Sequence, residues 1–424
     1  MKRLVVCCDG TWNKPDSAHI TNIEKIARTI QTDPSASGGV QQLVLYVGGV
    51  GIGYKLDQLL GGAFGSGLFN NVKTAYRFLA LNYEEGDEIF VFGFSRGAYT
   101  ARSLVGMIGY VGLLTRRSVI ADKLPEAVTR YQRKQPAAGA FGASNEEFKR
   151  DFCHADIPTK FIGVFDTVGA LGVPGMLPKD HQFHDINLGD SVQCARQALA
   201  IDEQRMVFAP CLWEAPERPE DPDRVKQVWF EGAHSDVGGG YGETGLSDTA
   251  LLWMASEANQ RGLVFDRPLL DSYIAGQSPA IRHNSLRWFY RISNLRKRML
   301  SRRSEEKSLF VGQRRNLCAP GSGVRLSSAA RSHYFDAEKD YRPRNLDLLV
   351  ESRDPEVVAA STEPVIALPE VSVESISARL EDAGVYLDRA RQVVPEARSA
   401  TMSGCRTTRT GSTGTTSTPR PTTR

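Results

Sequence analysis

The chain has 424 residues, of which 41% are hydrophobic and 24% are charged, as in an ordinary globular protein. Its net charge is +3, but residues 401–424 contain four arginines and no acidic residue, so residues 1–400 carry 3 − 4 = −1. This near-neutral body excludes the broad basic field that nucleic-acid binding requires.

Strand-like and helix-like segments alternate through the first 235 residues. In chain order, apolar runs predict strands at residues 4–8, 43–47, 88–94, 160–165 and 225–230. Apolar residues at helical spacing predict helices at residues 21–30, 68–83 and 97–108, and a further helix at 247–261. The alternation predicts an α/β fold with a mostly parallel central sheet and helices on both faces.

The C-terminal part is less regular. One helix is predicted at residues 373–390, after a proline-rich link. From residue 399 the chain consists almost entirely of Thr, Ser, Gly, Pro and Arg, a composition that cannot bury apolar area. We therefore expect a disordered tail over residues 399–424.

The seven cysteines are an odd number and form no CxxC pair, which favours reduced thiols over a disulfide framework. The apolar run at the start ends at Asp9, too early for a signal peptide, and no apolar run approaches the length of a membrane span. These features predict a cytoplasmic protein, and secretion by a signal-independent route stays open.

The sequence Gly-Phe-Ser-Arg-Gly at residues 93–97 lies between a predicted strand and a predicted helix. This is the setting of a nucleophile elbow, in which a strained turn lifts the Ser95 hydroxyl clear of the sheet. Gly93 and Gly97 lie where the neighbouring strand and helix leave no room for a side chain. The alternative is an ordinary Gly-Ser turn without chemistry.

A serine nucleophile needs a histidine base that is oriented by an acid. Asp166 follows the predicted strand at 160–165, and His234 follows the predicted strand at 225–230. Because nucleophile, acid and histidine come in this order in hydrolases with such an elbow, Ser95, Asp166 and His234 form the candidate triad. The alternatives are that Asp166 caps the segment that follows it and that His234 is an ordinary loop histidine with satisfied hydrogen bonds.

Asp202 and Glu203 are other candidate acids, but pairing with Arg205 is their preferred interpretation. A developing oxyanion also needs two N–H donors. The Arg96 amide is expected to be one of them, and the Gly10–Thr11 loop after the first strand is expected to supply the other. The glycine-rich loop at residues 48–53 is the second choice.

Other ligand classes find little support. His181 and His184 form an HxxH pair without a third ligand at a telling spacing, so we expect no metal and no other cofactor. The glycine clusters at residues 48–53 and 61–67 lack the lysine of a phosphate loop, which argues against nucleotide binding. The basic, aromatic-rich residues 282–307 could lie on an anionic membrane, although a solvated helix face is preferred.

Several motifs occur in one order and resemble those of an uncharacterised α/β-hydrolase-like family that is related to the phospholipase effectors of type VI secretion. The matching pieces are residues 8–13, 21–23, 49–51, 93–98, 165–168, 200–205, 232–241 and 341–346. The resemblance covers about residues 1–348 and implies a catalytic domain over that range. The helix predicted at residues 373–390 makes residues 349–398 a helical extension. It also implies a Ser-Asp-His triad at the positions above and a phospholipid substrate class.

The function expected from these residues is a serine hydrolase of the esterase or lipase type, with phospholipase activity included. It would cleave a small-molecule or lipid ester through an acyl-enzyme. The alternative is a catalytically silent protein of the same fold that binds an acyl group or another small ligand.

Overall fold

The computed structural model describes residues 1–10, 19–49, 63–133, 144–155, 157–168, 188–214, 218, 220–274, 278–286, 291, 294, 310–311, 314–319, 321–352 and 362–365. One compact unit spans Met1–Pro369, and a second unit spans Glu370–Arg424. The expected helix at residues 373–390 and the expected tail at 399–424 lie outside the described residues.

Eight of the described strands form one sheet, in the order β10-β9-β6-β5-β4-β3-β1-β2, and every neighbouring pair is parallel. Two further strands, β7 and β8, form a small antiparallel pair. The strands are β1 (Lys2–Cys8), β2 (Gln41–Val47), β3 (Glu88–Phe94), β4 (Thr159–Phe165), β5 (Ala195–Ala200), β6 (Val225–Phe230), β7 (Phe310–Val311), β8 (Arg314–Arg315), β9 (Val324–Ser327) and β10 (Thr362–Glu363).

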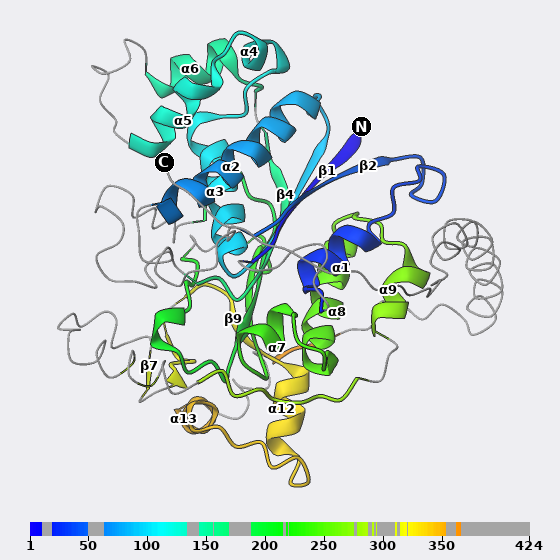
Figure 1. Ribbon diagram of the computed structural model, residues 1–424, viewed down its shortest axis with the longest axis vertical. Coiled ribbons are helices and arrows are strands. Elements are labelled where there is room, and N and C mark those ends of the chain that lie inside the picture. Colours follow the sequence, from blue (N-terminus) through cyan, green and yellow to red (C-terminus); the bar gives the residue numbers. More distant parts are fainter. Residues whose placement is uncertain are drawn as a thin grey trace, which may run out of the picture. The chain divides into compact units, whose positions relative to one another are not determined.

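Helices cover both faces of this sheet (Figure 1), so the predicted α/β class is confirmed. They are α1 (Asn22–Thr29), α2 (Ala63–Asn82), α3 (Arg96–Val111), α4 (Arg116–Ile120), α5 (Leu124–Arg133), α6 (Asn145–Phe152), α7 (His234–Gly238), α8 (Gly245–Gln260), α9 (Arg267–Ile274), α12 (Ser328–Phe335) and α13 (Arg344–Ser352), with a 3₁₀ turn, η4, at Met206–Phe208. Helices α2 to α6 lie on one side of the sheet in Figure 1, and α1, α8 and α9 lie on the other.

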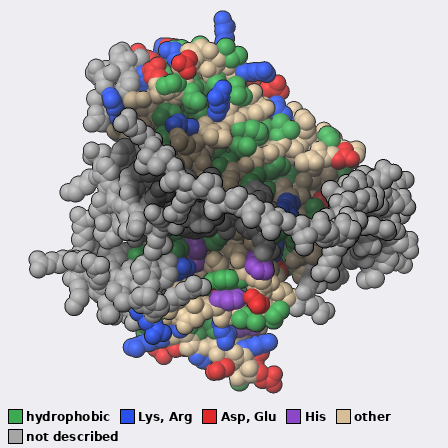
Figure 2. All heavy atoms as spheres, in the orientation of Figure 1, with side chains coloured by type: hydrophobic (Ala, Val, Ile, Leu, Met, Phe, Trp, Pro, Cys, Tyr) green, Lys and Arg blue, Asp and Glu red, His purple; other side chains and the backbone are tan. Residues whose placement is uncertain are grey.

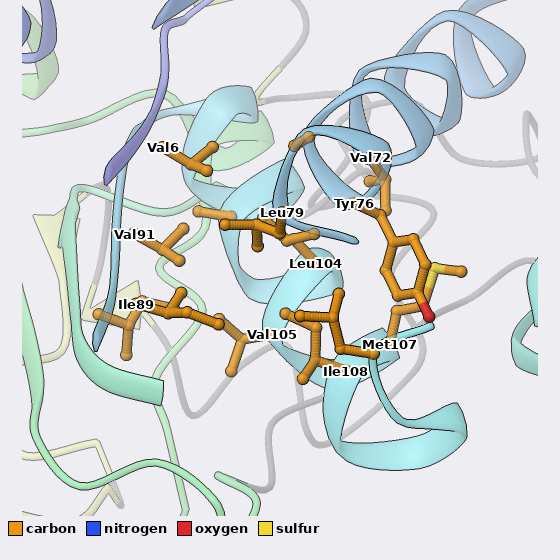
Figure 3. Packing of buried hydrophobic residues seen from close by; sticks show 14 of the residues in the cluster. Val6, Val72, Tyr76, Leu79, Ile89, Val91, Leu104, Val105, Met107 and Ile108 are labelled. Carbon is orange, nitrogen blue, oxygen red and sulfur yellow. The ribbon is translucent and has the colours of Figure 1, made fainter. Parts of the chain in front are cut away.

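The strands bury both faces, because successive side chains point to opposite sides of a sheet. In β1, Leu4 and Val6 pack with α2 and α3, whereas Val5 and Cys7 pack with the core under α1 and α8. Figure 3 shows the first of these cores. Its labelled members are Val6, Ile89 and Val91 from the strands, and Val72, Tyr76, Leu79, Leu104, Val105, Met107 and Ile108 from the helices.

The sheet contains one central strand that the sequence pattern did not predict. Strand β5 lies between β4 and β6, and all six of its residues are buried, including Arg196 and Gln197. Arg196 pairs with Glu257 of α8, and Gln197 bonds with Gln227 of β6 and with Thr167. These polar side chains interrupt the apolar run by which a central strand is recognised in a sequence, which is why β5 was not predicted. With β5 in place, β6 is not the strand that follows β4.

The C-terminal boundary expected at residue 348 falls inside α13. Beyond that helix, the short strand β10 pairs with β9 and extends the sheet. Part of the span expected to be a helical extension therefore adds to the sheet.

Helix length and surface charge bear on membrane contact. Among the described residues, no helix is both long enough and apolar enough to cross a lipid bilayer. On the face shown in Figure 2, Lys and Arg side chains are interspersed with Asp and Glu side chains. Most of the basic segment at residues 282–307 lies outside the described residues, so contact with a membrane surface stays a prediction.

Candidate active site

The strand order of the sheet reverses beside β1 and β3. The chain passes from β1 outward to β2 and then back across β1 to β3, so α1 and α3 cover opposite faces. In open parallel sheets, ligands bind at the carboxyl ends of the strands, at the point where the strand order reverses. Gly10 follows β1 at this edge, and Ser95 follows β3.

Ser95 occupies the turn between β3 and α3, with φ 56° and ψ −118°. Positive φ is strained for a residue with a side chain, and such strain is typical of a nucleophile elbow. The turn is fixed on both sides, because a Cβ on Gly93 would lie 2.6 Å from Ala98 Cα and one on Gly97 would lie 2.1 Å from Cys8 O. The two glycines thus let α3 begin directly against the ends of β1 and β3.

The three side chains of the candidate triad form one hydrogen-bonded chain. His234 Nε2 lies 2.8 Å from Ser95 Oγ, and His234 Nδ1 lies 2.6 Å from Asp166 Oδ2. Although β5 separates β4 from β6, the acid and the histidine meet across its carboxyl end. There Asp166 Oδ1 accepts the Ala200 amide at 2.9 Å.

All three residues are buried, with Asp166 fully so. Burial by itself raises the pKa of the Asp166 carboxyl, but the Arg315 guanidinium and the hydrogen bond from His234 outweigh it and hold that pKa well below its ordinary value. Burial lowers the pKa of the His234 imidazole below its ordinary value, although Asp166 acts in the opposite direction. An ionised carboxylate beside a neutral imidazole is the arrangement that general-base chemistry requires.

The ring of His234 is held between two aromatic rings. Phe94 lies tilted at 4.7 Å between ring centroids, and Phe208 of η4 meets it edge-on at 4.9 Å. The His234 amide donates to Glu203 Oε2 at 3.3 Å. Together with Asp166, these contacts fix the plane of the imidazole.

Helix α7, which begins at His234, is anchored through Asp236. The Asp236 carboxylate accepts the Ala233 amide at 2.8 Å and contacts His283 Nδ1 at 2.6 Å. The His283 ring in turn stacks on Tyr241, with centroids 4.0 Å apart. The first turn of α7 is therefore held by His283, which lies in residues 278–286.

The two alternative acids have other partners. Glu203 pairs with Arg205, at 2.8 Å between Oε2 and Nη2, as expected. Asp202 pairs with Arg314 at 2.9 Å instead of Arg205, and it also accepts the Gly232 amide at 2.9 Å. Neither carboxylate contacts His234 Nδ1; of the described carboxylates, Asp166 is the one that is hydrogen-bonded to the imidazole ring.

The expected oxyanion donors are only partly described. The Arg96 amide stands at the first position of α3, where the helix dipole favours negative charge. The Gly10 amide donates to Asp9 Oδ1 at 2.6 Å, so it would have to leave this partner to bind an oxyanion. Thr11 and residues 50–53 of the second candidate loop lie outside the described residues.

Two residues at this edge were not given a role from the sequence. Asp9 is buried and accepts hydrogen bonds from Thr21 Oγ1 at 2.6 Å and from the Tyr46 hydroxyl at 2.7 Å, and it thereby joins β1, β2 and the start of α1. Arg315 is fully buried and contacts both carboxylate oxygens of Asp166. No pattern in the sequence distinguishes Arg315 from an exposed arginine.

His181 and His184 lie outside the described residues. Among the residues that are described, no group of three or more His, Cys, Asp and Glu side chains could hold a metal ion.

Comparison with known protein families found a match. The family described as "T6SS, Phospholipase effector Tle1-like, catalytic domain" matches residues 2–257, more than half of the chain. The chain belongs to this family. The family match contains Ser95, Asp166 and His234 and ends before Arg315.

The chain is also similar to a yeast protein. The uncharacterized protein YEL023C of Saccharomyces cerevisiae is 30% identical over 240 residues, which cover 52% of this chain and 34% of the yeast protein. The chain thus spans about a third of the length of this relative.

Two solved structures were also found. An uncharacterized protein from Pseudomonas aeruginosa has a TM-score of 0.37 and 17% identity, over 62% of this chain and 46% of that chain. The Tle1 effector bound to the VgrG spike of the Type 6 secretion system has a TM-score of 0.32 and 17% identity, over 57% of this chain and 52% of that chain.

Proposed function

We propose that the protein is a serine hydrolase that cleaves a carboxylic ester, with phospholipids as the preferred substrate class. The observation that carries this proposal is the hydrogen-bonded chain from Ser95 Oγ through His234 to Asp166, on a strained turn at the carboxyl edge of a parallel sheet. Membership of a family named for phospholipase effectors supports the choice of a lipid ester.

The protonation states follow from the surroundings of Asp166. An ionised carboxylate can only accept hydrogen bonds, so His234 Nδ1 must carry the proton that lies between them. The neutral imidazole then presents the lone pair of Nε2 to the Ser95 hydroxyl at 2.8 Å. Ser95 is thereby paired with the base that its chemistry needs.

In the first half-reaction, Ser95 Oγ attacks the ester carbonyl carbon while its proton passes to His234 Nε2. The carbonyl oxygen becomes an oxyanion, for which the Arg96 amide is the proposed donor. Collapse of this intermediate breaks the ester bond, and the leaving alcohol takes the proton from His234. Water then repeats the sequence on the acyl-enzyme, which releases the carboxylic acid and restores Ser95.

The test compares the full-length protein with Ser95→Ala and with Ser103→Ala. Ser103 is also buried in α3 and lies outside the proposed machinery, so it controls for loss of a helix serine. Turnover of p-nitrophenyl butyrate and of a fluorogenic phospholipid in vesicles would be measured, together with labelling by a fluorophosphonate probe.

We expect Ser95→Ala to lose labelling and at least about 10⁴-fold in kcat, while Ser103→Ala keeps both. Unchanged ester turnover in Ser95→Ala would refute the proposal. A wild-type protein that is folded but neither labels nor turns over any ester would favour the alternative, a silent binding protein.

A further inference from the structure

Arg315 lies on a segment that is remote in sequence from the candidate triad. It belongs to β8, which pairs with β7 outside the eight-stranded sheet, and it follows His234 by 81 positions. Its side chain is nevertheless fully buried. A buried guanidinium is costly unless it is paired and hydrogen-bonded, so its partners indicate what it does.

The hydrogen-bond partners of the Arg315 side chain lie at the active-site edge. Nη1 lies 2.5 Å from Asp166 Oδ1 and Nη2 lies 3.0 Å from Asp166 Oδ2, which makes a two-pronged ion pair. The same two nitrogens donate to Ala200 O at 3.1 Å and to Phe208 O at 2.6 Å. Asp166 therefore accepts from the guanidinium, from the Ala200 amide and from His234.

We propose that Arg315 is a positioning residue of the hydrolase, which acts on the reaction only through Asp166 and His234. This inference rests on the proposed function. The two-pronged contact fixes the carboxylate plane, so that Oδ2 faces His234 Nδ1. Through the Phe208 carbonyl, the same guanidinium also holds η4, whose Phe208 ring packs edge-on against the imidazole.

The charge of Arg315 has a second consequence, which concerns pH. The charged groups that act on His234 include Asp166 after β4 and Glu203 and Arg205 after β5, and Arg315 on β8 pairs with Asp166. The guanidinium partly neutralises the carboxylate that would otherwise attract a proton to the imidazole. Arg315 therefore keeps His234 neutral, and able to act as a base, at a lower pH than Asp166 alone would allow.

A purely structural role is the competing interpretation, and the chain offers a matched control for it. Arg196 of β5 is also almost fully buried and pairs with Glu257 of α8. Its other hydrogen bonds go to the backbone carbonyls of Ala195, Asp223 and Arg224, so none of them reaches the triad. Replacing Arg196 removes a buried ion pair of the same kind without touching Asp166.

The experiment measures kcat/KM for p-nitrophenyl butyrate between pH 4 and pH 9 in wild type, Arg315→Ala, Arg315→Lys and Arg196→Ala, each corrected for its folded fraction. We expect Arg315→Ala to lose about 100-fold, because small displacements of a catalytic group cost this much. The acid limb of its kcat/KM profile should move to higher pH, and added methylguanidinium should restore part of the activity. Arg196→Ala should keep the wild-type profile per folded molecule.

Arg315→Lys keeps the charge but cannot make the two-pronged contact, so its kcat/KM should fall while its acid limb stays near that of wild type. It also serves if Arg315→Ala does not fold. If Arg315→Ala or Arg315→Lys is folded and has wild-type kcat/KM with an unchanged acid limb of its pH profile, the positioning role is overturned. The proposed function is not affected by that result. Loss without rescue, equalled by Arg196→Ala, would overturn the positioning role too. Absence of Ser95-dependent turnover in wild type would instead overturn the proposed function beneath it.

Discussion

The elbow makes a sharp prediction about Gly97, which lies two residues after Ser95. In Gly97→Ala the new Cβ would lie 2.1 Å from Cys8 O and 2.4 Å from Asp9 O. Both oxygens belong to the backbone at the end of β1, which is fixed by its pairing with β2 and β3. The strand cannot yield, so the start of α3 must retreat.

The size of this movement follows from the contact distances. Cβ atoms essentially never approach other heavy atoms below 3.0 Å, so the first turn of α3 has to move by about 1 Å. Ser95 moves with it, and its 2.8 Å contact with His234 Nε2 is lost. A misplacement of this size costs about 100-fold in kcat/KM, or about 2.7 kcal/mol of transition-state stabilisation. Overpacking should also destabilise the fold by about 1–3 kcal/mol.

The assay combines kcat/KM for p-nitrophenyl butyrate with the rate of fluorophosphonate labelling and with urea unfolding. Gly109→Ala is the control, because this glycine lies in the same helix and its Cβ would meet only Ser191 Oγ, at 3.4 Å. That change should leave activity intact and stabilise the helix by about 0.5–1 kcal/mol. Wild-type activity and stability in Gly97→Ala would refute the argument that the elbow has no room for a side chain.

Two further outcomes are expected at the same edge of the sheet. Burial lowers the pKa of His234, and its neutral form is the proposed base. As the pH falls, kcat/KM should therefore decrease with a midpoint below 6.5, the ordinary pKa of histidine. A midpoint above 6.5 would contradict this expectation. Asp9→Asn replaces a carboxylate that accepts hydrogen bonds from Gly10, Thr21 and Tyr46. Urea unfolding should therefore show a free energy of unfolding that is lower by about 1–3 kcal/mol, a larger decrease than in Tyr46→Phe, which removes one of these bonds. Equal decreases in the two variants would speak against a shared hydrogen-bond network.

Local pattern was sufficient where the physics is local. The apolar runs of β1 and β3 are uninterrupted, and α1 begins where its apolar spacing predicts, with Thr21 accepting the Glu24 amide at its start. The order of nucleophile, acid and histidine likewise predicted three side chains that the fold brings into contact.

Local pattern failed where burial depends on partners from elsewhere in the chain. Strand β5 was not predicted, because Arg196 and Gln197 are residue types typical of an exposed surface. In the structure they are buried in a central strand, where Glu257 pairs with Arg196 and Gln227 hydrogen-bonds with Gln197. Asp202 was assigned to Arg205 because the two are close in sequence, but its partner is Arg314.

The sequence by itself therefore determined the α/β class, the parallel sheet and the turn that carries Ser95, since strand periodicity and glycine placement are properties of short segments. Only the tertiary structure decided which groups set the pKa of His234, and that Arg315 lies behind Asp166. Hydrogen bonds and ion pairs between distant segments depend on distance in space. A buried charged residue produces no periodic pattern in the sequence from which its burial could be predicted.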